Sequence, residues 1–299
     1  MSDREGQGGE PFGETTDPAV YVARPASEAA LETASRAVAE RRIPALVGPP
    51  GIGKTLLLHR LADRLAARSR WKPVHLAYAS LGADELCSWV LGLLGHTSGP
   101  SPRESLLARA KAEAVQGCAV LVTVDEASGL SRETGDCLAS LCWQSGGGLA
   151  AALAATDDAR ASRALAGLGP DLEPIRYTAP LSALETRDYV AGRLAQRGAS
   201  EALRARFDAV AVEWIHRLSG GLPRRIHEVA ALLVEAPPDQ VTPAWWKDCG
   251  GALEAASDGL GLAGEVAPAR HPSPVEILDE PELWVGEDEE LDDLELELD

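Results

Sequence analysis

The sequence is poor in aromatic residues and has no long apolar run. Only 4% of its 299 residues are aromatic, so Ala, Leu and Val must supply most of a buried core. No apolar run approaches the ~20 residues that cross a bilayer, and the N-terminal stretch MSDREGQGGE lacks the basic and apolar regions of a signal peptide. The five cysteines show no CxxC spacing, which argues against a disulfide framework or a zinc site and favours buried, reduced thiols. These absences predict a cytoplasmic protein without a membrane span.

Basic residues are scarce as well. The chain has 28 Lys and Arg against 46 Asp and Glu, which gives a net charge of −18. Residues 271–299 alone contain 13 acidic and no basic residues, which leaves −5 for residues 1–270. This balance excludes a basic surface over the whole chain of the kind that binds nucleic acid, but it does not exclude a local basic patch.

The order of the patterns divides the chain into four parts. Residues 1–25, rich in Gly, Pro, Asp and Glu, predict a flexible lead. Residues 26–180 alternate short apolar runs with amphipathic segments, which predicts an α/β domain with a parallel sheet. Residues 181–249 show only helical periodicity, which predicts a small all-α lid domain. We expect residues 250–299 to form a disordered acidic tail. The expected strands are 45–47, 74–79, 119–124, 149–155 and 175–178; the expected helices are 27–42 (capped by Ser27), 55–69, 83–94, 102–116, 130–143, 158–168, 185–197, 201–207, 208–218 and 223–235.

A phosphate-binding loop is the clearest motif. Gly48-Pro-Pro-Gly-Ile-Gly-Lys-Thr55 fits the pattern G-x-x-x-x-G-K-[ST] between an expected strand and an expected helix. Glycines let the backbone turn its N–H groups toward a polyphosphate, and the following helix presents its positive end there. Lys54 would contact the β- and γ-phosphates, and the Thr55 hydroxyl would bind Mg²⁺. The candidate nucleotide-binding residues are Gly48, Pro49, Pro50, Gly51, Ile52, Gly53, Lys54, Thr55 and Leu56.

An acidic pair, Asp125-Glu126, follows the apolar run Val120-Leu-Val-Thr-Val124. An aspartate at the end of such a strand holds Mg²⁺ in phosphate-loop enzymes. The adjacent Glu126 is placed to orient or deprotonate the attacking water as a general base. The alternative is that the pair only caps the helix that follows.

Together these motifs resemble the AAA+ ATPases, and more narrowly their ExeA/GspA-like branch, which is related to transposition ATPases of the TniB/MuB type. The resemblance implies an αβα sandwich with a five-stranded parallel sheet of order 5-1-4-3-2, followed by a helical lid, and it favours ATP over GTP. The similar segments, beyond the phosphate loop, are Pro11-Phe12 with Asp17-Pro18, Tyr21 and Ser27-Glu28-Ala29-Ala30-Leu31; Asp125-Glu126-Ala127 with Leu130; Ala179-Pro180-Leu181 with Glu185-Thr186, Tyr189-Val190 and Arg193-Leu194; and Ser219-Gly220-Gly221-Leu222-Pro223-Arg224-Arg225-Ile226.

The resemblance also implies two nucleotide sensors and reveals one departure. Arg224 falls at the sensor-2 position, where a lid arginine reaches the γ-phosphate, and Thr156 falls at sensor 1, where the family usually has a longer polar residue. AAA+ enzymes usually receive an arginine finger from a neighbouring subunit, but Asp171 stands at the position where the ExeA-like pattern has that arginine. Arg160, Arg163 and Arg176 are close in sequence without matching the position.

These observations predict an ATP hydrolase that binds Mg-ATP through Lys54, Thr55 and Asp125, uses Glu126 in hydrolysis, and couples nucleotide state to lid movement and to assembly or remodelling of a partner complex. We expect a homo-oligomer or hetero-oligomer. Two alternatives are a transposition-type ATPase associated with nucleic acid and a slow or non-hydrolysing ATP-dependent adaptor. Residues 271–299 are either a solubilising segment or an acidic-hydrophobic peptide that docks a protein client or folds back over the arginines of the lid.

Overall fold

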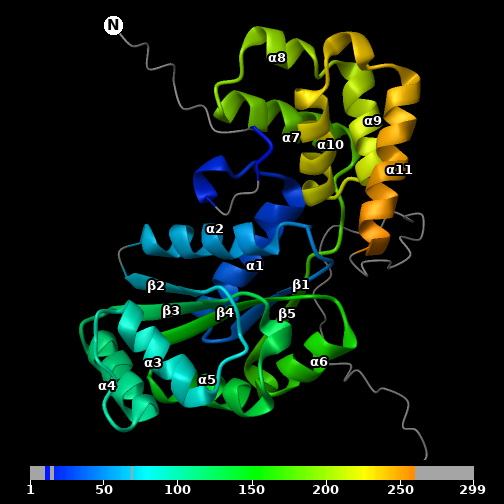
Figure 1. The fold of residues 1–299 in the computed structure, drawn as a ribbon. Helices are drawn as coiled ribbons and strands as arrows, with labels where there is room; N and C mark the ends of the chain where they lie inside the picture. The colour runs from blue at the N-terminus through cyan, green and yellow to red at the C-terminus, as the bar shows by residue number, and fades with distance from the viewer. Residues whose placement is uncertain (1–10, 14–16, 69, 260–299) are drawn as a thin grey trace, which may run out of the picture.

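The computed structural model describes residues 11–13, 17–68 and 70–259, and its centre is a parallel sheet (Figure 1). The five strands lie in the order β2-β3-β4-β1-β5. This is the predicted order 5-1-4-3-2 viewed from the other edge, so the predicted topology is confirmed. The strands are β1 (Ile43–Val47), β2 (Trp71–Leu76), β3 (Ala119–Val124), β4 (Leu149–Ala155) and β5 (Leu172–Arg176).

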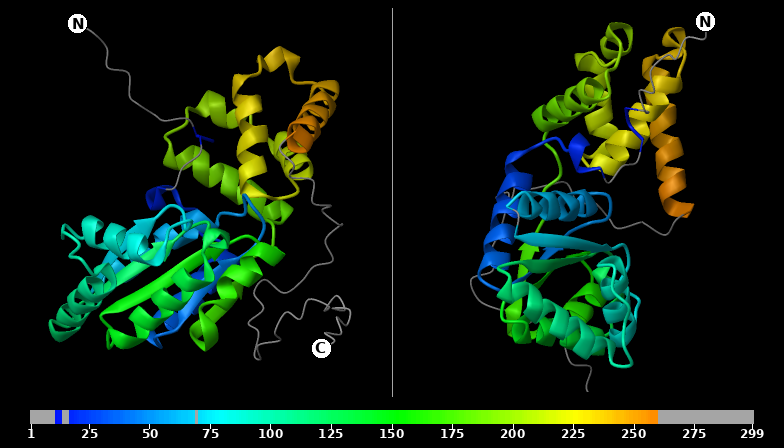
Figure 2. Two further views of the ribbon diagram at one scale, coloured as in Figure 1. Left: turned by 60° about the horizontal axis from the view of Figure 1, so that its bottom comes forward. Right: turned by 90° about the vertical axis from the view of Figure 1, so that its left-hand side faces the viewer.

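Helices cover both faces of the sheet, as Figures 1 and 2 show. Residues of α1 and α2 form one apolar cluster with one face of the strands, and residues of α3, α4, α5 and α6 form a second cluster with the other face. Every residue of β3 and β4 is buried, which explains their unbroken apolar sequences. The helices are α1 (Pro25–Ala39), α2 (Lys54–Ala66), α3 (Ala83–Leu93), α4 (Pro102–Val115), α5 (Arg132–Gln144) and α6 (Ala159–Ala166); short 3₁₀ turns are η1 (Pro18–Val20), η2 (Ala127–Gly129) and η3 (Gly169–Asp171).

The helical region after Pro180 has its own apolar core. It consists of α7 (Ala183–Gln196), α8 (Glu201–Ala205), α9 (Ala209–Ser219), α10 (Pro223–Glu235), the turn η4 (Pro238–Gln240) and α11 (Pro243–Gly259). Trp246 is 3% exposed and stacks in parallel on Trp214, with 6.2 Å between the ring centroids. None of the helices within the described ranges is long and apolar enough to cross a membrane.

The C-terminal boundary differs from the expectation. The tail was expected to begin at residue 250, but α11 continues through Gly259. Consecutive glycines at 250 and 251 weaken the helical signal there, although glycine costs only about 1 kcal/mol in a helix that other contacts hold. Residues 260–299, and with them the expected acidic recognition segment, lie outside the described residues.

The first helix also begins earlier than expected. It starts at Pro25, and the residue before it, Arg24, occupies the cap position that Ser27 was expected to fill. Ser27 is instead a buried residue of the first turn, and its hydroxyl lies 2.9 Å from the Tyr177 hydroxyl. Proline is common at the first position of a helix because its missing N–H has no helical partner there. The contact with Tyr177 joins the start of α1 to the chain beyond β5.

The five cysteines are free thiols, but only Cys87 and Cys249 are buried; the other three are half-buried. The expectation of buried, reduced thiols therefore holds fully for Cys87 and Cys249 and in part for the other three. Cys87 and Cys137 share a hydrogen bond between α3 and α5, which raises the pKa of Cys87 and, aided by the nearby Arg103 guanidinium, lowers the pKa of Cys137 to about 7.

Candidate nucleotide-binding site

The predicted phosphate loop connects the end of β1 to the start of α2. Gly51 and Gly53 have φ values of 77° and 104°, a left-handed backbone that glycine adopts without steric cost. A Cβ at Gly48 would lie 2.0 Å from the carbonyl oxygen of Tyr177, so this position also requires glycine. Ile52 is 1% exposed and packs in the core beneath the loop, so its side chain anchors the loop and does not line the cavity.

The side chain of Lys54 lies inside this loop. Its ammonium donates hydrogen bonds to the carbonyl oxygens of Gly48 at 2.8 Å and Pro49 at 2.9 Å. Burial lowers the pKa of Lys54, while the negative charges of Asp125 and Glu126 oppose that shift. The ammonium is therefore held where a polyphosphate would replace the two carbonyl contacts with stronger, charge-assisted ones.

Thr55 and Asp125 meet across the gap between α2 and β3. The Thr55 hydroxyl donates to Oδ2 of Asp125 at 2.5 Å, and Oδ1 of Asp125 accepts the backbone N–H of Glu126 at 2.9 Å. A hydroxyl and a carboxylate so close together supply the oxygen ligands that Mg²⁺ prefers. The pair fits a Mg²⁺ site.

Glu126 lies directly beyond this pair and is exposed to solvent. Its backbone is left-handed, with φ 51°, which is unusual for a residue other than glycine and costs of order 1–3 kcal/mol. Such strain is often found where a side chain must point in one functional direction. Glu126 lines the same cavity as Lys54 and Thr55.

Thr156 follows β4 and lines the cavity, but its hydroxyl already has two partners. It donates to Asp158 Oδ2 at 2.5 Å and lies 2.8 Å from the Ser128 hydroxyl. The bond from Thr156 lowers the pKa of Asp158, the residue that caps α6. Thr156 thus connects the cavity wall to the 3₁₀ turn after Glu126 and to α6.

Arg224 brings the lid to the phosphate loop. Its backbone N–H donates to the Gly51 carbonyl at 3.1 Å, and a Cβ at Gly51 would lie 2.8 Å from Arg224 Cβ. Its guanidinium is half-exposed and lies 3.9 Å from the Glu228 carboxylate. A second junction, Leu181 N–H to the Gly221 carbonyl at 2.9 Å, ties the start of the lid to the turn before α10.

The end of the cavity away from the phosphate loop is aromatic. The Tyr189 hydroxyl and His227 Nε2 are 2.8 Å apart, and their rings stack at 5.8 Å. Burial raises the pKa of Tyr189 to about 12, and burial together with the Arg193 charge lowers the pKa of His227 to about 4, so both groups are neutral at pH 7. Phe12 completes this end, 5% exposed and edge-on to His227 at 6.0 Å.

Arg193 holds Phe12 in place. This arginine is 1% exposed, and its guanidinium donates to the carbonyl oxygens of Pro11 and Gly13, each at 3.2 Å. Residues 11–13 belong to the stretch that the composition predicts to be a flexible lead, yet Phe12 lines the cavity. The family resemblance of Pro11-Phe12 is the one sequence signal for this, and no sequence motif singles out His227.

These groups surround one cavity of about 620 Å³. It brings together Lys54, Thr55, Asp125, Glu126, Thr156 and Arg224, together with Pro50, Gly51, Gly53 and Leu56 of the loop. Gly48, Pro49 and Ile52 support the loop without lining the cavity. The volume lies within the range of about 300–1,000 Å³ that is usual for small-molecule sites.

Arg160 and Arg163 lie outside this cavity. Both are on α6 and, with Arg132, line a separate cavity of about 590 Å³ beside Ser128. Asp171, the residue at the expected arginine-finger position, ends η3 just before β5. Within the described part of the chain, the phosphate-loop cavity contains one sensor arginine candidate, Arg224, and no arginine from the segment before β5.

This architecture and phosphate-loop cavity define an AAA+ ATPase fold. Residues 38–161 match a family model described as an AAA domain. The structure resembles that of the Aeropyrum pernix ORC2 protein in ADPNP-ADP complexes, with a TM-score of 0.59, 17% identity, and coverage of 85% of this chain and 74% of that chain. It also resembles Drosophila ORC bound to DNA (TM-score 0.54, 16% identity, 82% and 70% coverage) and Cdc6p from Pyrobaculum aerophilum (0.51, 16%, 80% and 67%). No curated protein gave a significant match.

Proposed function

We propose that the chain binds Mg-ATP in the phosphate-loop cavity and hydrolyses it. The observation that carries this proposal is the contrast between the two ends of the cavity. One end has an ammonium, a helix N-terminus and an oxygen pair for a cation; the other has Phe12, Tyr189 and His227. A nucleoside triphosphate has the same polarity, an anionic chain at one end and a flat base at the other.

Each phosphate-end residue has a separate task in this proposal. Lys54 exchanges its two carbonyl contacts for phosphate oxygens, and Thr55 and Asp125 hold Mg²⁺, which neutralises phosphate charge when bound. Glu126 orients and deprotonates the attacking water, while Thr156 positions it. Arg224 contacts the terminal phosphate, so that the lid angle depends on whether that phosphate is present.

The base end suits a flat, neutral base through its aromatic rings and uncharged polar groups. The Tyr189–His227 pair is uncharged at neutral pH, which suits a neutral base, and Phe12 supplies a ring for contact with it. Because Phe12 belongs to the N-terminal segment and Tyr189 and His227 to the lid, a bound base would hold these two parts together. Nucleotide binding would therefore order the segment around Phe12 as well as the lid.

We further propose that the chain works as a homo- or hetero-oligomer that assembles or remodels a partner complex, in the manner of the ExeA/GspA-like or TniB/MuB-type ATPases. The support is the family resemblance and the position of Arg160 and Arg163 outside the chain's own nucleotide cavity. Without an arginine supplied by a neighbouring subunit, hydrolysis should be slow, since such an arginine accelerates phosphoryl transfer ~10³–10⁵-fold in related systems.

Steady-state phosphate release by the full chain and its Glu126→Gln variant tests the hydrolysis. We expect Glu126→Gln to abolish turnover while Mg-ATP still binds, because the amide keeps the shape but cannot accept the proton of water. Glu32→Gln, the same change at an exposed site on α1, is the matched control and should leave turnover unchanged. Equal and measurable turnover in wild type and Glu126→Gln would refute the role of Glu126. Equal and negligible turnover in both would favour the non-hydrolysing adaptor.

A further inference from the structure

A third cavity, which we call the arginine-rimmed cavity, opens at the end of the sheet where the strands begin, opposite the phosphate loop. It has a volume of about 270 Å³ and is lined by residues from the ends of α1 and α2 and the starts of β1, β2 and β4. Its apolar floor includes Ile43, Leu65 and Leu149, and Arg41, Arg68 and Arg70 stand at its rim. Helix α2 separates it from the phosphate loop by about 20 Å, the length of 13 helical residues.

The rim arginines have no acidic partner among the described residues. Arg42, which also lines the cavity, forms an ion pair with Glu173 and donates to the Leu172 carbonyl. By contrast, within residues 17–68 and 70–259 no carboxylate comes within 4.0 Å of the guanidinium groups of Arg41, Arg68 or Arg70; Arg70 lies instead over the Trp71 ring. Three positive charges therefore surround an apolar floor.

The turn that ends α1 holds Arg41 at the rim. Its φ is 65°, the left-handed conformation usual for the residue after a helix C-cap. The Arg41 N–H donates to the Val38 carbonyl at 3.2 Å, and the Arg42 N–H donates to the Ala37 carbonyl at 2.8 Å. This turn fixes the backbone of Arg41 beside the cavity.

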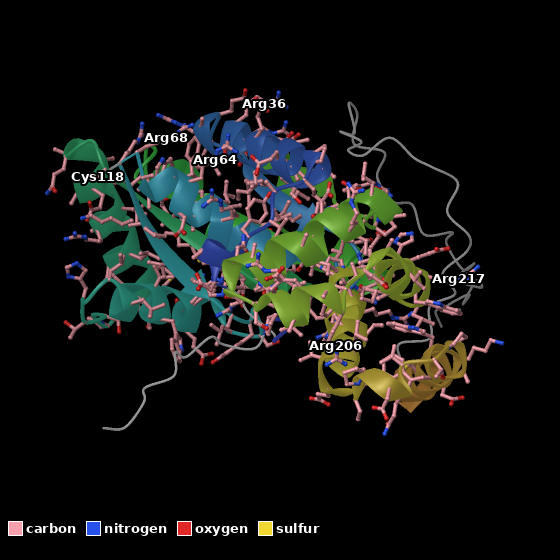
Figure 3. The ribbon with its side chains drawn as sticks, turned by 90° about the horizontal axis from the view of Figure 1, so that it is seen from above. Arg36, Arg64, Arg68, Cys118, Arg206 and Arg217 are labelled. Carbon is pink, nitrogen blue, oxygen red and sulfur yellow. The ribbon has the colours of Figure 1, made fainter. Side chains whose placement is uncertain are left out.

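The arginines of the lid are less available. Arg206 donates to the Val234 carbonyl at 3.0 Å and also to the carbonyls of Leu233 and Ala236, so it caps the end of α10. Arg217 lies over the Trp214 ring. Figure 3 shows these two on the lid, whereas Arg36, Arg64 and Arg68 gather on the outer layer formed by α1 and α2.

We propose that the acidic segment 287–299 of this chain docks in the arginine-rimmed cavity. The segment has nine carboxylates interspersed with Leu291, Leu294, Leu296 and Leu298. The leucines can pack on the apolar floor, and the carboxylates can form ion pairs with the rim arginines. A phosphodiester backbone could pair with the arginines but has no apolar groups for the floor. This assigns the segment to the base of the nucleotide-binding domain and not to the lid.

The connection is long enough for the chain's own segment to reach. Roughly 30 residues separate Gly259 from Leu291, and 30 residues span up to about 100 Å when extended. A domain of this size has a radius of gyration of about 19 Å. Intramolecular docking is therefore sterically possible from any exit direction of α11.

Zero-length cross-linking of the full chain tests the proposal. A carbodiimide joins an amine directly to a carboxylate, so Arg68→Lys places a reactive amine at the rim while keeping its charge. We expect Lys at position 68 to cross-link to carboxylates of residues 287–299, with a yield about tenfold above that of Arg163→Lys. Arg163 is the matched control because it is an exposed arginine of the other arginine-lined cavity.

Two further measurements make the result specific. Adding Arg41→Glu and Arg70→Glu to Arg68→Lys should lower the yield about tenfold, as expected for the loss of two exposed ion pairs. A mixture of ¹⁵N-labelled and unlabelled chains should give cross-links within one chain only. Equal yields at positions 68 and 163, insensitivity to the Arg41 and Arg70 changes, or cross-links that mix labelled and unlabelled chains in the statistical proportion would overturn the proposal.

Discussion

Phe12 offers a test of how the N-terminal segment contributes to the nucleotide site. Replacing a buried phenylalanine with alanine in a core costs about 3–5 kcal/mol. Phe12 is only 5% exposed, but residues 11–13 are otherwise held mainly by the two 3.2 Å hydrogen bonds from Arg193. Residues 11–13 can detach from the lid when the ring is lost. The loss in the free energy of unfolding therefore cannot exceed the free energy with which this segment docks. We expect Phe12→Ala to lower the free energy of unfolding by about 2–3 kcal/mol, or the Tm by roughly 4–12 °C.

The same substitution should also weaken Mg-ATP binding. Loss of a ring contact with the base costs about 1–1.5 kcal/mol, which is a roughly 5- to 12-fold increase in Kd. Phe207 provides the matched control, because its ring packs on Phe12 at 5.2 Å but does not line the nucleotide cavity. Thermal unfolding and calorimetric titration would measure the two effects. Phe12→Ala with unchanged ATP affinity, or Phe207→Ala with an equal loss of affinity, would refute the role of Phe12 at the base.

Three further outcomes follow from the geometry. Gly51→Ala should destabilise the fold by about 1–3 kcal/mol more than Gly53→Ala, since both have positive φ but only the first would press a Cβ against Arg224. Equal Tm losses would contradict the close lid contact. Thr156→Val should slow ATP turnover at least about tenfold with Kd almost unchanged; unaltered turnover would remove Thr156 from the catalytic set. The rate at which iodoacetamide alkylates Cys137, followed by mass spectrometry, should rise with pH around a midpoint of about 7, because the lowered pKa leaves the thiolate dominant above that pH. A midpoint near ~8.5, the pKa of a free thiol, would disprove the lowered pKa of Cys137.

The family resemblance implied the sheet order, and the apolar runs predicted the full extent of β3 and β4, but the starts of β1, β2 and β5 were missed. The continuous apolar runs of β3 and β4 reflect burial on both faces. Strands β2 and β5 lie at the edges of the sheet and contain Pro73 and Pro174. An edge strand tolerates proline because one side of its backbone needs no partner, so the first residues of both strands were missed. The first residues of β1 were also missed, because Pro44 interrupts the strand pattern at its second residue.

The phosphate end of the candidate site was predictable because its chemistry is local in sequence. The loop from Gly48 to Thr55 and the pair Asp125-Glu126 are short motifs whose residue types are dictated by phosphate and Mg²⁺. The base end is assembled from Phe12, Tyr189 and His227, which lie in the N-terminal segment and in two different lid helices. Its aromatic character comes from tertiary packing, and the pKa of His227 is lowered by burial that no sequence pattern displays.

Calorimetric titration of Mg-ATP into the full chain and its Lys54→Met variant tests the central claim most directly. The Lys54 ammonium makes charge-assisted contacts worth about 1.5–3 kcal/mol, so binding should weaken roughly 10- to 150-fold in the variant. The Tm without nucleotide should show that the variant remains folded. Saturable binding to the wild type and this loss in Lys54→Met are the expected results. No binding to the wild type, or equal affinity in both proteins, would contradict the assignment of the phosphate-loop cavity as a nucleotide site.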